Sequence, residues 1–374
     1  QTVSHIFSLR GVEKNKKVLS QIVKGIVITI PVLIIFLFLF SSADLVFQKY
    51  LSDLIHLGPE TVSRSILSLI TTLIFIGAYT YSLRVKERQL AQEQSDNNLN
   101  VGRIESSIIL GSVNILFFIF ILVQVTYLFG GQSTIVAQGF TYAEYARRGF
   151  FELIGVAVIS FLLLLATEKF VARKETDHAV WFKMLSTTLV VQVLLIMASA
   201  LTRLSLYEEA YGFTTSRLYG HTFIMLLAIV FFLLLYKIYK DKRESAFAFR
   251  VFISIALYLV AMNVFNPDAF IARRNIERFA TTGKLDIEYL GRLSDDAIPT
   301  TIKALEIPNE DLKKGFAREL YRHTQYIRAP HFSKWQSWNL SRRRANTILS
   351  SKMHEIEPYK DYQQQNLDSI ERYK

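Results

Sequence analysis

The feature that most constrains the fold of this chain is a series of long apolar stretches separated by polar, charged segments. Seven stretches reach, or nearly reach, the roughly 17–25 residues that a helix needs to cross the hydrocarbon core of a bilayer. They lie at approximately 22–40, 66–83, 107–129, 149–167, 184–201, 220–236 and 251–265. The sequence therefore predicts an all-α, polytopic membrane helix bundle with about seven spans.

The distribution of Lys and Arg predicts how these spans are oriented. The three loops between the predicted outer ends carry two basic residues each, whereas the other ends carry five, four, four and five. The basic ends are Arg10, Lys14, Lys16, Lys17 and Lys24; Arg84, Lys86, Arg88 and Arg103; Lys169, Arg173, Lys174 and Lys183; and Lys237, Lys240, Lys242, Arg243 and Arg250. Because cytoplasmic loops are enriched in positive charge, we expect a cytoplasmic N-terminus and an extracytoplasmic segment after residue 265.

The charge and the cysteine content of the chain indicate which kinds of binding partner to expect. The formal net charge of +11 would suit nucleic-acid binding, but much of the excess lies beside the spans on one side. There it orients helices and meets anionic lipid, so we expect the lipid bilayer as a partner and no nucleic acid. The chain contains no Cys, which excludes disulfides and thiolate ligands. It begins with Gln1, and we expect a fragment with further helices upstream.

The pattern changes after residue 265 and predicts two domains: a transmembrane bundle, 1–265, and an extracytoplasmic α-helical domain, 266–374. Asn266-Pro267-Asp268 is a strong helix start, with Asn as cap, Pro at the first helical position and an acid in the first turn. The last span and this helix are therefore expected to join almost directly. A short amphipathic helix is also predicted at 44–57, between the first two spans.

Further helix limits in the second domain follow from capping and breaking residues. Gly283 is predicted to end the first helix, and Asp286 and Ser294 to cap two short ones. A longer helix is predicted to open at Pro308-Asn309 and to run to about residue 328. The last helix is predicted at about 337–352.

The chain contains several motifs in a fixed order: YLFGG (127–131), TYAEYARRGFFEL (141–153), RLSLYEEAYGFTTSRL (203–218), NPDAFIARRNIER (266–278) and DIEYLGRLSDDAIP (286–299). Together they resemble a known bacterial multi-pass membrane family, the one catalogued as domain of unknown function 4173. The resemblance covers most of the chain from about residue 105 to about residue 305. It implies a bacterial plasma membrane protein and carries over no catalytic residue.

Polar residues of these motifs gather at the predicted outer ends of the spans. At about 100° per residue, Tyr145, Arg148 and Glu152 share one helix face, so we expect Glu152 to pair with Arg148 or with Arg203. We favour a structural ion-pair network; the alternative is an outward-facing pocket for an anionic or glycan-like head group. The candidate binding residues are Tyr145, Arg148, Glu152, Arg203, Tyr207, Glu208, Arg217, Asn266 and Asp268.

Other polar residues receive structural interpretations. Asn114 and Gln192, deep in two spans, are expected to bond between helices rather than to line an ion path. Asp295-Asp296, after Ser294, resembles a paired-carboxylate site, but adjacent acids at a helix start more often serve the helix dipole. His323 and His331 are interpreted as surface residues.

The basic run Arg342-Arg343-Arg344, near Trp335 and Trp338, has two interpretations. We favour a solvated helix face. The alternative is contact with anionic lipid or with a polyanionic envelope polymer.

Three functions remain open. We favour a non-enzymatic scaffold, sensor or regulator of the bacterial cell envelope, whose outer domain meets a protein partner. The alternatives are a carrier or flippase-like protein for a polar or lipid-linked substrate, and a membrane-embedded transferase that uses Glu152 or Asp268. The sequence has no P-loop, no Gly-x-Gly-x-x-Gly and no His-x-x-Glu-His spacing, so neither a cofactor nor a metal is predicted.

Overall fold

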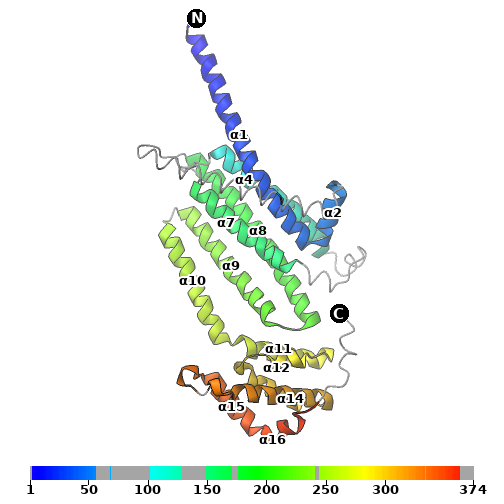
Figure 1. Ribbon diagram of the computed structural model, residues 1–374. Helices are drawn as coiled ribbons and strands as arrows, with labels where there is room; N and C mark the ends of the chain where they lie inside the picture. The colour runs from blue at the N-terminus through cyan, green and yellow to red at the C-terminus, as the bar shows by residue number, and fades with distance from the viewer. Residues whose placement is uncertain are drawn as a thin grey trace. The chain divides into compact units, whose positions relative to one another are not determined.

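The computed structural model describes residues 2–55, 68, 102–128, 149–170, 176–240, 244–332 and 334–362. These residues form helices and short turns, and no strand occurs among them (Figure 1). They group into two compact units. The first consists of Gln1–Leu206 and Phe223–Ser254, and the second of Tyr207–Thr222 and Ile255–Lys374.

Six of the helices are long and apolar enough to cross a membrane. They confirm six of the seven predicted spans, and the remaining one, 66–83, lies outside the described residues except for Ser68. The last span begins at Glu244, earlier than the predicted residue 251. The six are α1 (Thr2–Ala43), α4 (Arg103–Leu128), α7 (Phe150–Phe170), α8 (Thr176–Tyr211), α9 (Thr215–Lys240) and α10 (Glu244–Phe265). The protein is therefore a multi-pass, all-α membrane protein.

The exposed faces of these helices carry many large hydrophobic side chains. Large hydrophobic side chains such as Val27, Phe118, Leu195, Phe232 and Leu257 are exposed. A soluble helix would carry polar side chains on such a face, whereas a membrane span meets lipid tails there. Backbone groups are satisfied within each helix, as the absence of water in hydrocarbon requires.

Aromatic side chains fill the core of the first unit where α1 packs against α4 and α7. The rings of Phe40 and Phe120 stack with centroids 3.9 Å apart, and Phe36 meets Phe117 edge to face at 4.9 Å. Gly25 brings α1 close to α4, since a Cβ atom there would lie 3.2 Å from Glu105 Cα. Small residues at such crossings let two membrane helices approach closely.

The predicted amphipathic helix after the first span is α2 (Leu45–Ile55). Asp44 is its cap: Oδ1 accepts hydrogen bonds from the backbone amides of Val46 and Phe47, both at 3.0 Å. This prediction is confirmed, and Asp44 proves to have a second role described below.

The second unit contains the helical domain predicted after residue 265. Its helices bury their own hydrophobic core, which includes Ile271, Leu290, Phe316, Leu320 and Leu349. The α-helices are α11 (Pro267–Thr282), α12 (Ile287–Gly291), α13 (Ile298–Thr301), α14 (Glu310–Ile327), α15 (Leu340–Ser351) and α16 (Met353–Ile356). Five short 3₁₀ turns connect or extend them: η1 (Asp295–Ala297), η2 (Ile302–Glu306), η3 (Pro330–Phe332), η4 (Trp335–Ser337) and η5 (Glu357–Tyr359).

Most predicted helix limits in this domain are confirmed. Asp286 caps α12 through its side chain, Asn309 caps α14, and Gly283 ends α11 with a positive φ of 65°. Two predictions are wrong. Ser294 precedes η1 but its side chain makes no capping hydrogen bond, and α15 begins at Leu340 rather than at residue 337 because Asn339 provides the cap.

A single residue separates α10 from α11, as predicted. Asn266 has a positive φ of 53°, and its Oδ1 accepts a hydrogen bond of 3.2 Å from the Ala269 amide. The left-handed conformation turns the chain within one residue, and Asn tolerates it better than most residues. The junction is therefore short and is fixed at both the backbone and the side chain.

We expect Asn266→Ala to lower the free energy of unfolding by about 1–2 kcal/mol, because it loses the side-chain cap and because Ala tolerates a left-handed backbone less well than Asn. Asn266→Gly should lose less, since glycine adopts positive φ without strain. Melting temperatures of the full chain in detergent would measure both. Equal losses for Ala and Gly would show that the backbone conformation contributes nothing.

Candidate functional site

Arg203, one of the predicted binding residues, is among the most buried side chains of the first unit. Its Nη2 donates to Asp44 Oδ2 at 2.5 Å, and its Nη1 donates to the Ala43 carbonyl at 3.1 Å. The side chains of Arg203 and Asp44 are only 1% and 2% exposed. Arg203 therefore fixes the junction of α1 and α2 to α8.

This contact gives Arg203 an acidic partner other than the expected Glu152. Glu152 lies half-buried in the first turn of α7, and the guanidinium of Arg203 is directed to Asp44 instead. Asp44 lies outside the outer motifs, so a pattern of residues on one helix face within those motifs does not reveal it. Tyr145 and Arg148 lie outside the described residues, so the pairing of Glu152 with Arg148 stays a prediction.

Three further predicted residues lie together in the second unit, at the end of α8 and the start of α9. The Arg217 guanidinium stacks 4.0 Å from the centroid of the Tyr207 ring, and its Nη1 donates to the Gly212 carbonyl. Glu208 is buried, with Oε1 3.4 Å from His221 Nδ1. The contacts favour the structural interpretation, because they bind these side chains to one another and to the backbone.

Arg278, which the sequence analysis did not select, completes this group. Its Nε and Nη2 donate to the carbonyls of Glu209 and Ala210, the last turn of α8. Partial burial and then the neighbouring charge of Arg217 lower the pKa of Arg278. Cationic side chains at a helix C-terminus satisfy its free carbonyls and its dipole, so both arginines are accounted for by capping.

Asn266 and Asp268, the last two predicted residues, have local roles in the second unit. Asn266 caps α11. Asp268 Oδ2 accepts a hydrogen bond of 3.0 Å from the backbone amide of Ser294. Asp268 thereby anchors the segment that leads to Asp295, which borders the cavity described next.

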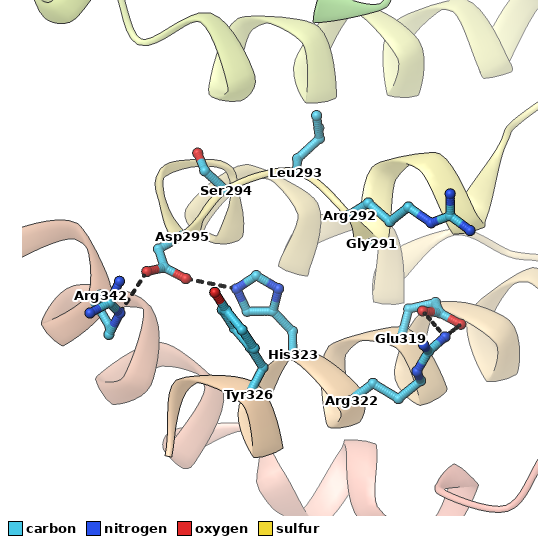
Figure 2. A pocket seen from close by; sticks show the side chains of 10 residues that line it. All are labelled: Gly291, Arg292, Leu293, Ser294, Asp295, Glu319, Arg322, His323, Tyr326 and Arg342. Atoms are coloured by element: carbon cyan, nitrogen blue, oxygen red, sulfur yellow. Dashed lines mark hydrogen bonds and ion pairs between the residues drawn. The ribbon is translucent and has the colours of Figure 1, made fainter. Parts of the chain in front are cut away.

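A cavity of about 510 Å³ opens in the helical domain, and it is our candidate functional site (Figure 2). Its volume is within the range of roughly 300–1,000 Å³ that is typical of small-molecule sites. One wall is the segment from α12 to η1, and the others come from α14 and α15. The lining residues are Gly291, Arg292, Leu293, Ser294, Asp295, Glu319, Arg322, His323, Tyr326 and Arg342.

Asp295 is the central polar group of this pocket. Figure 2 shows it between Arg342 and His323: Oδ1 lies 2.9 Å from His323 Nε2 and Oδ2 lies 3.1 Å from Arg342 Nε. The hydrogen bond from His323 is the largest of the effects that lower the pKa of Asp295, and Arg342 adds to it against the opposing effect of burial. Asp295 is therefore ionised at neutral pH, an acceptor rather than a general acid.

These contacts overturn two interpretations from the sequence. His323 is not a surface residue, since its side chain is 10% exposed and bonded to Asp295. Asp295 does not simply serve the dipole of η1, because it joins η1 to α14 and α15. Arg342 likewise contacts Asp295, whereas its neighbours Arg343 and Arg344 are exposed as expected. No sequence spacing links positions 295, 323 and 342, so only the fold reveals the group.

Glu319 forms the second acidic element of the pocket, and it is almost fully buried. It accepts hydrogen bonds from Arg318 Nη2 at 2.7 Å and from Arg322 Nη1 at 3.1 Å. Gly291 lies directly against it, because a Cβ at that position would be 2.8 Å from Glu319 Cβ. The absence of a side chain at Gly291 thus lets α12 approach α14 closely.

Several buried polar groups of the first unit have structural partners. Asn114 Nδ2 donates to the carbonyls of Leu110 and Leu185, and Gln192 Nε2 donates to the Asn114 carbonyl, so both join α4 to α8 as expected. Lys237 and Glu168 form a second buried ion pair at 2.6 Å. Among the described residues, no group of three or more His, Asp or Glu side chains is placed to hold a metal ion.

Comparison with models of protein families assigns the chain to a family. Residues 3–304 match the model of the family described as Domain of unknown function (DUF4153). The protein belongs to this family. The finer assignment from the motifs, domain of unknown function 4173, is not confirmed. No curated protein and no solved structure matches the chain. The DUF4153 match includes the pocket wall at 291–295, whereas the walls from α14 and α15 follow its end.

We expect Asp44→Asn to destabilise the bundle by about 3–5 kcal/mol, because the buried Arg203 charge would lose its partner. The melting temperature of the purified full chain measures the effect. Asp53→Asn is the matched control, since Asp53 is exposed on the same helix α2. Equal melting temperatures for Asp44→Asn and the unmodified chain would contradict a stabilising role of the pair.

We expect Asp295 to stabilise the helical domain in a pH-dependent way. A carboxyl whose pKa is lower in the folded state binds fewer protons there, so its contribution is present above its ordinary pKa of about 4 and is lost as pH falls through the lowered value. Asp295→Asn should therefore lower the melting temperature at neutral pH, and the difference from the unmodified chain should shrink as pH falls below about 4 and vanish below the lowered pKa of Asp295. Asp296→Asn is the control; a constant difference down to low pH would refute this linkage.

Proposed function

We propose that the protein is a non-enzymatic scaffold, sensor or regulator of the bacterial plasma membrane. In this proposal the bundle anchors a helical domain outside the cell, and that domain binds a ligand or partner through its pocket. The observation that supports the proposal is the pocket itself, a cavity of about 510 Å³ within a domain that has its own hydrophobic core. Its acids are engaged by Arg and His side chains, which suits binding rather than proton transfer.

The orientation rests on charge. The basic ends of the spans alternate with loops of low charge, and positive charge is enriched on the cytoplasmic side of membrane proteins. On this basis the segment between α9 and α10 is cytoplasmic, and the domain after α10 is extracytoplasmic. The one-residue junction at Asn266 supports a domain held firmly by its span, because a flexible linker is absent at that point.

A carrier is the second candidate, and one observation favours it. Among the described residues, the buried atoms Gln192 Oε1 and Ser199 Oγ of α8 have no hydrogen-bond partner. The two residues are seven apart and therefore lie on nearly the same face of the helix. Polar groups inside a span that lack a hydrogen-bond partner in the protein can line a route for water or a polar substrate.

Single-cysteine labelling tests the proposed orientation, and the chain suits this method because it has no native Cys. We expect Ser351→Cys, exposed on α15, to react with a membrane-impermeant maleimide in intact cells. Ser245→Cys, exposed at the start of α10, should react only after the membrane is permeabilised. The reverse pattern would refute the proposed orientation and, with it, an extracytoplasmic binding domain.

The same scan tests the carrier. Gln192→Cys and Ser199→Cys should stay unreactive toward small water-soluble thiosulfonates if α8 is packed, as a scaffold requires. Rapid reaction at both positions, with no reaction at the neighbouring lipid-facing Leu195→Cys, would favour a water-filled route and the carrier.

A further inference from the structure

We propose that the pocket of the helical domain binds an oxyanion, a phosphate or carboxylate group, carried on a body of about the size of a sugar. This deepens the proposed function, because it names the ligand class of the same site. Three features of the pocket support this ligand class. They are the positions of its charged side chains, the arginine donors that lie outside ion pairs, and an aromatic ring in its lining.

The two acids of the pocket lie below its surface, whereas two of its arginines lie at the surface. The side chains of Glu319 and Asp295 are 4% and 13% exposed, whereas those of Arg322 and Arg292 are 67% and 72% exposed. Burying a carboxylate requires partners, and both acids have them. A ligand that enters therefore meets positive charge first, and the buried acids contribute little repulsion.

The exposed arginines keep hydrogen-bond donors for a ligand. Arg322 contacts Glu319 through Nη1, which leaves Nε and Nη2 out of that ion pair, and Glu319 retains Arg318 as a second partner. Arg292 contacts Glu288 through Nη2. In Figure 2 both lie on the other side of the pocket from Arg342. A guanidinium presents its donors in a planar fork that matches carboxylate and phosphate oxygens.

An aromatic side chain provides a surface for the body of the ligand. Tyr326 lines the pocket, is half exposed, and packs edge to face against Phe332 with ring centroids 5.1 Å apart. The Arg342 guanidinium covers Phe332 at 3.7 Å, which fixes this aromatic pair. The cavity of about 510 Å³ is much larger than a lone phosphate ion needs, so a charged group attached to a ring suits it better.

Calorimetric titration of the purified full chain tests the proposal. In a nonionic polyoxyethylene detergent, we expect glucose 6-phosphate and glucuronate to bind saturably, inorganic phosphate to bind more weakly, and glucose not to bind. Tyr326→Ala should weaken binding of glucose 6-phosphate and leave inorganic phosphate unchanged. If none of the three anions binds at millimolar concentration, or if glucose binds as well as its phosphate, the proposal is wrong.

Arginine variants supply the control for non-specific attraction. Arg322→Gln and Arg292→Gln should each weaken binding about tenfold, the equivalent of about 1.4 kcal/mol. Arg274→Gln removes a similar exposed, acid-paired arginine from α11, outside the pocket, and should leave the affinity unchanged. Melting temperatures confirm that each variant folds. If all three substitutions weakened binding equally, the binding would come from the overall positive charge of the protein, and the proposed site would be wrong.

A competition experiment distinguishes a lipid head group from a soluble molecule as the source of the oxyanion. With the chain in nanodiscs, loss of glucose 6-phosphate binding in phosphatidylglycerol but not in phosphatidylcholine would identify a lipid head group. Equal binding in both would identify a soluble ligand; either result retains the oxyanion chemistry. The titration does not depend on orientation, so a failure to bind and a reversed labelling pattern overturn different conclusions.

Discussion

The absence of water inside a bilayer is the constraint on which the first unit depends. A charge that helix packing encloses away from water has to find a partner, because no solvent replaces its hydration. Arg203 meets Asp44 and the Ala43 carbonyl, and Lys237 meets Glu168. Each pair joins helices that are far apart in the chain. The packing of phenylalanines on α1 and α4 then fills the space between these contacts.

The helical domain follows the same rule with smaller elements. Glu319 and Asp295 are enclosed, and each is held by two basic side chains from neighbouring turns or helices. Because arginine has a long side chain, its guanidinium can pair with a buried acid and still lie near the surface. The result is a pocket with an acidic floor and a basic entrance, and this arrangement is the basis of the proposed oxyanion specificity.

The two candidate functions differ in the part of the molecule that does the work. A scaffold or sensor uses the pocket of the second unit, and the bundle serves as its anchor. A carrier uses the interior of the bundle, where buried polar atoms of Gln192 and Ser199 have no hydrogen-bond partner among the described residues. The described contacts of Asn114 and Gln192 join α4 to α8, which is the behaviour of packed helices and supports the first candidate.

Sequence alone determined the helices, because hydropathy, capping and helix breaking act over a few residues. The spans, the Asp44–Ile55 segment, the Asn266 cap and the Gly283 stop follow from such local patterns. Partner choice was decided by the tertiary structure. Asp44 and Arg203 are 159 residues apart, and Asp295 meets side chains 28 and 47 residues further on. A motif selects residues that are close in the chain, whereas a buried charge is neutralised by whichever opposite charge the packing brings within a few ångströms.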